Sequence, residues 1–174
     1  MMSADGQNQC AVVLVGHGSV AADVPRPLVQ RLRALEAERR STGGQMSDEE
    51  RDLDARIRHW PRTPATDPYK AGIDAIAEAL RIRMGHVVVA FNEYCAPSLE
   101  EAVGALAQAG TTRITIVTTM LTPGGVHSEV EIPETVRALQ EAHPGVVLRY
   151  AWPFNLGAVA SLLADACHVP AGGQ

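Results

Sequence analysis

The sequence is poor in cysteine, in long apolar runs and in net positive charge, and each shortage excludes a class of protein. Its three cysteines are few and widely spaced, so they form no disulfide framework and favour a reducing compartment such as the cytoplasm. No apolar run approaches the ~20 residues of a membrane span, so we expect no contact with a membrane. The first nine residues have no basic region and no apolar core, so we expect no secretory signal.

The formal net charge of −5 argues against a partner made of nucleic acid, because such partners select basic surfaces. The charges are unevenly placed, however. Residues 26–83 hold eleven arginines and the only lysine against ten acids. We interpret these residues as solvated helix faces of mixed charge. The alternative is an arginine-lined mouth for an anionic ligand, because guanidinium groups match carboxylates and phosphates in geometry.

What the sequence does contain is typical of one globular domain with alternating strands and helices. A chain of 174 residues can bury a core without disulfides or a metal, so we expect a single domain over residues 1–174. Short runs rich in valine and isoleucine predict buried strands of a parallel sheet at residues 10–16, 86–91, 113–119 and 146–150. Amphipathic patterns between and after them predict helices, so the fold class is α/β with right-handed crossovers.

The first crossover is much longer than a single connecting helix requires. Three helices are expected in it, near residues 27–40, 48–60 and 68–84. Ser47 begins a capping box, and Asp67 is followed by a proline at the first helical position. Residues 41–67 therefore look like an insertion that carries its own helix. The later helices are expected at residues 99–109, 128–141 and 155–167, and a capping box at Ser98 begins the first of them.

Three residues that can bind a metal follow the first three strands. His17 comes after the first strand and Glu93 after the second, while His127 follows a glycine-bearing loop after the third. Ligands of open parallel sheets bind at the carboxyl ends of the strands, so we expect these side chains to meet there. Two imidazoles and one carboxylate suit a borderline divalent cation and leave coordination positions open. Taken alone, each residue is better explained as a cap or a hydrogen-bonded loop residue, and only the three together favour a metal site.

Other polar and aromatic residues have a structural and a functional interpretation. Cys95 is either a buried thiol or a soft metal ligand. His59 and Trp60 are either a surface pair or part of a lid, and residues 152–155 either pack internally or form a wall of the cleft. The sequence has no CxxC pair and no HExxH helix, which excludes the common zinc motifs.

Four stretches together carry a family resemblance. They are residues 14–19 (LVGHGS), 90–93 with 97–102 (AFNE, PSLEEA), 110–114 (GTTRI), and 121–127 with 131–133 (LTPGGVH, EIP). In order and spacing they resemble the single-domain sirohydrochlorin chelatases, which are class II tetrapyrrole metal chelatases of the CbiX/SirB type. The resemblance covers roughly residues 11–24 and 86–165, and it does not include the insertion at 41–67.

The resemblance implies a three-layer, flavodoxin-like fold around a four-stranded parallel sheet. It implies a lyase-class chelatase that inserts Co²⁺ or Fe²⁺, with Ni²⁺ as a further option, into an anionic early tetrapyrrole such as sirohydrochlorin. The metal is then a substrate, and no organic cofactor is needed. His17 and His127 would be metal ligands that also accept protons, and Glu93 the third ligand. A homodimer is expected, because single-domain members resemble half of a two-lobed enzyme.

Two other functions remain open at this point. The insertion motivates the first, a carrier or sensor that binds a metal or a tetrapyrrole without turnover. The second is a hydrolase or transferase that uses His17 as a base. The absence of a GxSxG elbow and of a P-loop motif disfavours this second alternative.

Overall fold

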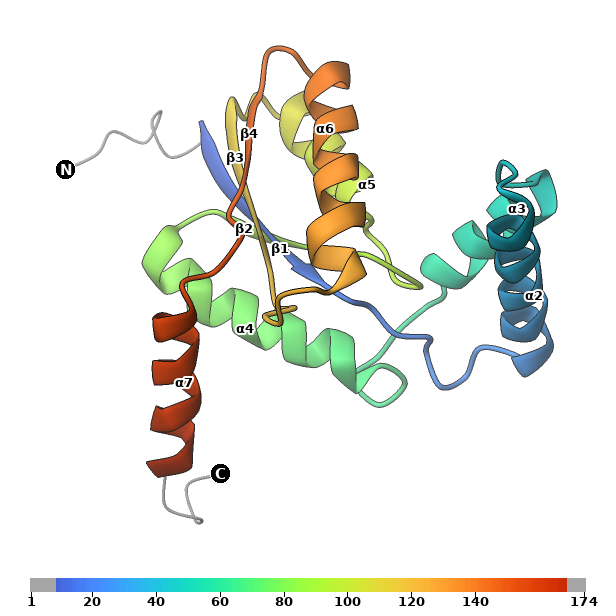
Figure 1. Cartoon of the computed structure of the whole chain (residues 1–174), viewed down its shortest axis with the longest axis horizontal. Helices are drawn as coiled ribbons and strands as arrows, with labels where there is room; N and C mark the ends of the chain where they lie inside the picture. The colour runs from blue at the N-terminus through green and yellow to red at the C-terminus, as the bar shows by residue number, and fades with distance from the viewer. Residues whose placement is uncertain (1–8, 169–174) are drawn as a thin grey trace.

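A computed structural model describes residues 9–168 of the chain, and Figure 1 shows its arrangement. The expectation about an N-terminal signal concerns residues 1–9, nearly all of which lie outside the described range. Four parallel strands form one sheet in the order β2-β1-β3-β4. They are β1 (Cys10–Gly16), β2 (Val87–Phe91), β3 (Arg113–Thr118) and β4 (Val147–Tyr150). The predicted four-stranded parallel α/β fold is confirmed.

Strand β1 is central because its side chains are apolar in both directions. Val13 and Val15 are fully buried against α5 (Leu99–Gln108) and α6 (Ile132–Ala142), which cover one face of the sheet. On the other face, Val12 and Leu14 pack with α4 (Pro68–Met84). A strand between two helical layers needs apolar residues at every position, which explains the unbroken run in the sequence.

The predicted caps explain where three of the helices begin. Ser47 accepts a hydrogen bond of 3.1 Å from the backbone of Glu50 at the start of α3 (Asp48–Arg58). Asp67 does the same for α4, at 2.9 Å from the backbone nitrogen of Lys70. Ser98 forms a complete capping box for α5. These side chains satisfy backbone donors that the first turn of a helix leaves free.

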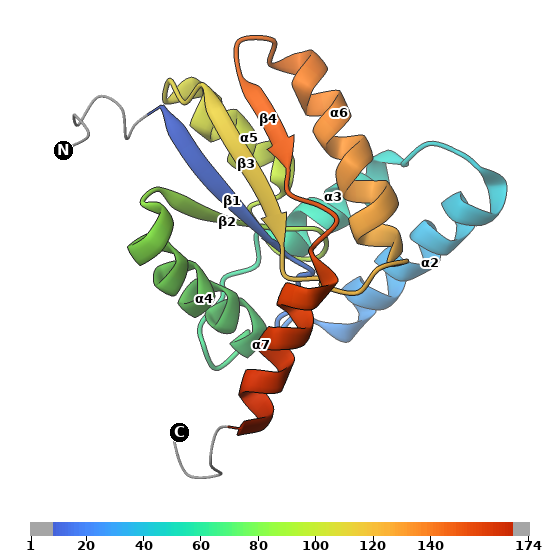
Figure 2. The ribbon, with the colours of Figure 1, turned by 60° about the vertical axis from the view of Figure 1, so that its left-hand side comes forward.

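The long first crossover forms a helical hairpin of α2 (Arg26–Thr42) and α3, which stands apart from the sheet in Figure 1 and is seen from another side in Figure 2. A separate small core holds the hairpin together. Leu32 of α2 and Ile57 of α3 are fully buried in it, together with Ala21 and Val24 from the segment after β1. The crossover therefore adds a second hydrophobic cluster beside the sheet.

The helix expected at residues 128–141 is not uniform. The chain turns first through a π-helical segment at His127–Glu131, labelled η1, and then continues as α6. Pro133 has no N–H to bond the carbonyl four residues earlier, which favours a wider turn at this point. The last helix, α7 (Leu156–His168), lies close to its predicted bounds. Among residues 9–168, no helix has the length and apolar character needed to cross a membrane.

Candidate metal centre

The three residues singled out in the sequence lie together at the carboxyl end of the sheet. One side-chain ligand atom each from His17, Glu93 and His127 lies within 4.8 Å of the others. All three side chains are partly buried. The two imidazole rings meet edge to face, with their centroids 4.8 Å apart. The cluster thus joins three loops, which follow β1, β2 and β3.

Local hydrogen bonding assigns the tautomer of His17. Its Nδ1 lies 2.9 Å from the carbonyl oxygen of Gly18, and a carbonyl oxygen can only accept a hydrogen bond. Nδ1 therefore carries the proton, and the lone pair is on Nε2. This Nε2 lies 3.8 Å from a carboxylate oxygen of Glu93. The backbone nitrogen of His17 donates to the hydroxyl of Tyr69 at 2.9 Å, which fixes the loop against α4.

Two other residues, Glu131 and Asn92, fix the orientation of the His127 ring. Its Nδ1 lies 2.7 Å from Oε2 of Glu131, one π-helical turn along the chain. The amide nitrogen of Asn92 donates to the same oxygen at 2.8 Å. Burial raises the pKa of Glu131, but the hydrogen bonds from Asn92 and His127 outweigh it and hold the pKa below its ordinary value. The amide nitrogen of Asn92 also lies 2.9 Å from Nδ1, so the two nitrogens converge on one carboxylate oxygen. An ionised carboxylate only accepts, which places a proton on Nδ1 and leaves Nε2 able to bind a metal.

Gly18 allows the loops after β1 and β2 to touch. Its φ is +96°, and a Cβ added there would lie 1.8 Å from the carbonyl oxygen of Glu93. The backbone nitrogen of Glu93 in turn donates to the carbonyl of His17 at 2.8 Å. Only glycine fits this close approach, so Gly18 makes possible the contact between the loops that carry His17 and Glu93.

A cavity of about 480 Å³ adjoins the two histidines. Most of its remaining lining comes from the loop after β3, including Thr119, Met120 and Leu121. Gly125, from the glycine-bearing loop before His127, also lines it. An apolar cavity beside a few converging polar groups is the usual form of a small-molecule site.

The other residues for which the sequence allowed a functional role have packing or pairing partners in the structure. Cys95 is fully buried, and burial raises the pKa of its thiol to about 11, so it remains protonated and fits the structural interpretation. His59 pairs with Glu101 of α5 at 3.0 Å, and Trp60 packs beside the hairpin core. Trp152 packs between the rings of Tyr150 and Phe154.

Two arginines of the first crossover have structural partners near the site. Arg58 is bonded to Asp54 at 2.7 Å and donates to the carbonyl of Asn92 at 3.1 Å. Arg62 is almost fully buried and pairs with Asp67. These two guanidinium groups hold loops together, so neither is a free anion-binding group.

Sequence reasoning missed the partners of His127. Asn92 and Glu131 lie within stretches that carried the family resemblance, but no role was assigned to either. The signal for Glu131 is its spacing of four residues from His127, which places both side chains on one face of a helical turn. Asn92 carried no such signal, because its contact with His127 joins residues on different loops.

The fold is shared with solved structures of low sequence identity. One, from Marinobacter aquaeolei VT8, is described as a cobalamin (vitamin B12) biosynthesis CbiX protein. It is 19% identical, with 91% of this chain and 97% of that chain covered and a TM-score of 0.53. SirB from Bacillus subtilis with Fe³⁺ is 18% identical over 93% of this chain, with a TM-score of 0.52.

A further structure is the sirohydrochlorin chelatase SirB from Bacillus subtilis subspecies spizizenii in complex with cobalt. It is 16% identical over 92% of this chain, with a TM-score of 0.47. This chain spans about half the length of both SirB chains, 48% and 51%. No curated protein matches the sequence.

The family assignment comes from the sequence of the second part of the chain. The model of the CbiX family matches residues 65–167. This range includes Glu93 and His127, and it begins after the helical hairpin. Since the match extends over more than half of the 174 residues, this chain belongs to the CbiX family.

Proposed function

We propose that this protein is a metal chelatase that inserts a divalent metal into an early tetrapyrrole such as sirohydrochlorin. The observation that carries the proposal is the cluster of His17, Glu93 and His127, whose ligand atoms lie within 4.8 Å of one another beside a cavity. Membership of the CbiX family supports it. The metal is the substrate, Co²⁺ or Fe²⁺ with Ni²⁺ as a further option, and the product would serve cobalamin or siroheme synthesis.

The chemistry requires a metal that is held weakly and two acceptors for protons. The free Nε2 atoms of His17 and His127 and the carboxylate of Glu93 would bind the metal and leave other positions open. Insertion releases two pyrrole protons and transfers M²⁺ to the macrocycle, so the core of the product is neutral. Neutral imidazoles accept protons near pH 7, and each histidine can take one as it releases the metal.

We further propose that residues 1–174 form one chelatase-like domain in which residues 41–67 are an insertion. The insertion carries α3, which packs against α2 and whose Arg58 donates to the carbonyl of Asn92 beside the site. A cytoplasmic enzyme without an organic cofactor fits this chemistry.

An anaerobic absorbance assay tests the activity directly. Purified protein is mixed with sirohydrochlorin and Co²⁺ or Fe²⁺, and the rate of spectral conversion is compared with the spontaneous rate. We expect acceleration by the wild type, loss of it in His127→Ala, and no change in His86→Ala, which replaces an exposed histidine at the opposite end of the sheet. Metal binding without acceleration would contradict the proposal and favour a carrier or sensor.

A further inference from the structure

The insertion ends in a contact with the loop that carries two residues of the site. Arg58 is the last residue of α3 and belongs to residues 41–67, whereas the match to the CbiX family begins only at residue 65. The loop after β2 holds Asn92 and the candidate ligand Glu93. A segment from outside the family match therefore adjoins residues on which the candidate metal centre depends.

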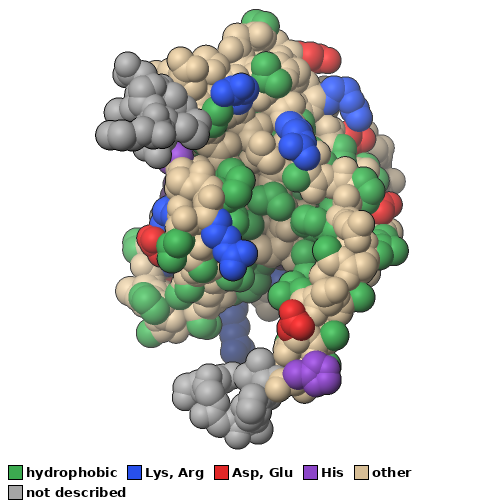
Figure 3. Space-filling view, turned by 90° about the vertical axis from the view of Figure 1, so that its left-hand side faces the viewer, with side chains coloured by type: hydrophobic (Ala, Val, Ile, Leu, Met, Phe, Trp, Pro, Cys, Tyr) green, Lys and Arg blue, Asp and Glu red, His purple; other side chains and the backbone are tan. Residues whose placement is uncertain are grey.

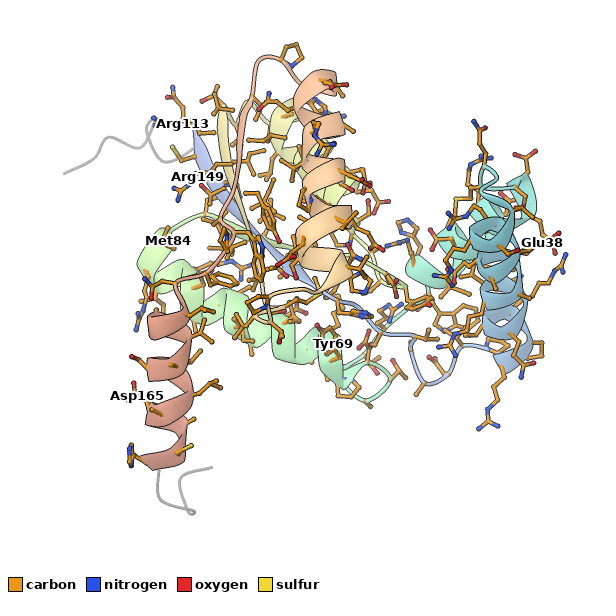
Figure 4. The ribbon with its side chains drawn as sticks, viewed as in Figure 1. Glu38, Tyr69, Met84, Arg113, Arg149 and Asp165 are labelled. Atoms are coloured by element: carbon orange, nitrogen blue, oxygen red, sulfur yellow. The ribbon has the colours of Figure 1, made fainter. Side chains whose placement is uncertain are left out.

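The hairpin of α2 and α3 stands on the same side of the molecule as this loop. Figure 3 shows the face on the side away from the hairpin, and hydrophobic side chains are gathered in its hollow. Covering exposed hydrophobic surface there is therefore not the role of the hairpin. Figure 4 labels Tyr69 at the end of α4 that lies toward the hairpin, and the hydroxyl of Tyr69 accepts from the backbone of His17. The hairpin thus lies on the side of the candidate metal centre.

Arg58 forms hydrogen bonds with both ends of the loop at residues 92–96. Its backbone carbonyl accepts from the backbone nitrogen of Ala96 at 3.1 Å, and its Nη2 donates to the carbonyl of Asn92 at 3.1 Å. Asp54, one turn earlier in α3, accepts from Nε at 2.7 Å and so fixes the direction of the guanidinium group. The side chain of Arg58 is only 19% exposed, which shields these contacts from water.

The peptide group between Asn92 and Glu93 is held at both of its polar atoms. Its carbonyl oxygen accepts from Arg58, and its N–H donates to the carbonyl of His17 at 2.8 Å. A peptide group is planar, so bonds to both atoms fix the plane from which the chain continues to Asn92 on one side and Glu93 on the other. In this arrangement the amide nitrogen of Asn92 lies 2.8 Å from Oε2 of Glu131.

The loop and its partner both contain features that cost free energy. Tyr94 has a φ of +55°, a left-handed conformation that is uncommon for residues other than glycine. Nη1 of Arg58 is buried and has no hydrogen-bond partner within residues 9–168. Strained backbone persists only where the surrounding structure holds it, and it gathers at functional sites. An unpaired buried donor likewise suggests that Arg58 is placed for a purpose other than stability.

We propose that Arg58 is a positioning residue for the candidate metal centre, which it serves by holding the peptide group after Asn92. With this peptide fixed, the Asn92 amide stays on Oε2 of Glu131, and the same oxygen accepts from Nδ1 of His127. Without Arg58 the peptide can rotate, the amide moves, and the His127 ring loses its single orientation. The consequence for metal affinity rests on the proposed function, and the inference gives the insertion a role in it.

The tautomer of His127 in the metal-free protein provides the first test. At a pH of about 8, where imidazoles are neutral, ¹⁵N NMR should show the His127 proton on Nδ1 in the wild type. In Arg58→Gln we expect both tautomers of His127, with the signals of the distant His86 unchanged. The matched variant Arg56→Gln removes an exposed arginine from the same turn of α3 and should keep the wild-type spectrum. Wild-type signals of His127 in Arg58→Gln overturn the proposal.

A second variant keeps this test decisive if Arg58→Gln does not fold. Asp54→Asn retains Arg58 but removes the charge that directs its guanidinium group. It should populate the second tautomer of His127 to a smaller extent than Arg58→Gln. An unchanged tautomer in Asp54→Asn, with Arg58→Gln unfolded, would mean that Arg58 supports the fold alone, and this result also overturns the proposal.

A double-mutant cycle on metal affinity separates positioning from a general loss of structure. Arg58→Gln should weaken Co²⁺ binding about 10-fold, at the lower end of the effects of outer partners of ligating histidines. Asn92→Ala removes the amide through which Arg58 acts, so the double variant should lose much less than the product of the two single losses. Two losses that multiply would show that Arg58 acts independently of Asn92, and the proposal would then be wrong.

The positioning role and the proposed function can fail separately. A wild-type protein that binds no Co²⁺ would contradict the proposed function, and the tautomer of His127 in the metal-free variants would still decide the role of Arg58. An Arg58→Gln variant with the wild-type tautomer and full chelatase activity would overturn the positioning role alone.

Discussion

The two histidines of the site are oriented by the same kind of hydrogen bond. Each has its Nδ1 beside an oxygen that only accepts hydrogen bonds, the Gly18 carbonyl for His17 and the Glu131 carboxylate for His127. This hydrogen bond occupies Nδ1 and leaves Nε2 as the free nitrogen in both rings. The partners differ in charge, however. A carboxylate partner strengthens metal binding by the histidine that it orients, so we expect His127 to be the stronger ligand of the two.

Substitution of Glu131 tests this role. In Glu131→Gln, the side chain can still accept from Nδ1 of His127, but the negative charge is lost. We expect the affinity for Co²⁺ to fall about 10- to 100-fold, as is common when an outer partner of a ligating histidine is removed. A titration followed by visible absorbance measures the change.

The control for this substitution is Glu134→Gln, which removes an exposed carboxylate from the next turn of the chain. It should bind Co²⁺ as the wild type does, and both variants should keep the circular dichroism of the folded protein. Equal affinities in the two variants would show that Glu131 does not assist His127.

At the scale of elements, one buried ion pair connects the loops around the site. Arg62 pairs with Asp67 and donates to the carbonyl of Ser19 at 2.9 Å and to the carbonyl of Tyr94. Asp67 also accepts from the hydroxyl of Ser19 at 2.7 Å and caps α4. The pair thereby joins the loops after β1 and β2 to the segment between α3 and α4.

Removing the charge of Asp67 should therefore destabilise the fold in a pH-dependent way. Burial raises the pKa of Asp67, but its hydrogen bonds to Lys70, Ser19 and Arg62 together lower it below its ordinary value. The stability that this carboxylate contributes is thus present above its unfolded pKa and lost as the pH falls through its folded pKa. We expect Asp67→Asn to lower the free energy of unfolding by about 3 kcal/mol at pH 7, because Arg62 is left buried and unpaired.

Urea unfolding from pH 7 down to pH 3 measures this effect. The variant should lose less stability than the wild type as the pH falls, since one carboxylate that titrates on unfolding is gone. Asp74→Asn is the control, because its ion pair with Lys70 lies at the surface, where such pairs contribute about 0.5 kcal/mol. Parallel pH profiles for wild type and Asp67→Asn would contradict the assignment.

At the scale of the whole molecule, the candidate metal centre is assembled only in the folded chain. His17 and His127 are 110 positions apart in the sequence, and the three loops meet because β1, β2 and β3 end at one edge of the sheet. A ligand that binds only the folded state stabilises it.

Thermal unfolding should consequently respond to the metal. At a free Co²⁺ concentration of 100 times the dissociation constant, the gain is about 2.7 kcal/mol. For a chain of this size, that gain raises the midpoint of unfolding by about 5–10 °C. The increase should vanish in His17→Ala and persist in His86→Ala. An equal increase in His17→Ala would mean that the metal binds elsewhere.

Much of the fold follows from local patterns in the sequence. Valine-rich runs predicted the strands within a residue or two, and Ser47, Asp67 and Ser98 marked helix starts that the structure confirms. These signals are local, because strand burial and N-terminal capping depend on residues within a few positions of one another. The π-helical turn before Pro133 was missed, because the pattern of apolar residues is continuous through it.

The sequence by itself determined the α/β class, the parallel sheet, the family and the three residues that follow the strands. Only the tertiary structure decided that Asn92 and Glu131 share a hydrogen-bonding site with His127, that Gly18 makes room for the backbone of Glu93, and that no residue of α7 is buried. The physical reason is the separation along the chain over which each kind of interaction acts. Propensity and capping act between neighbours in the chain, whereas hydrogen-bond partners and uncovered surfaces depend on how distant segments pack.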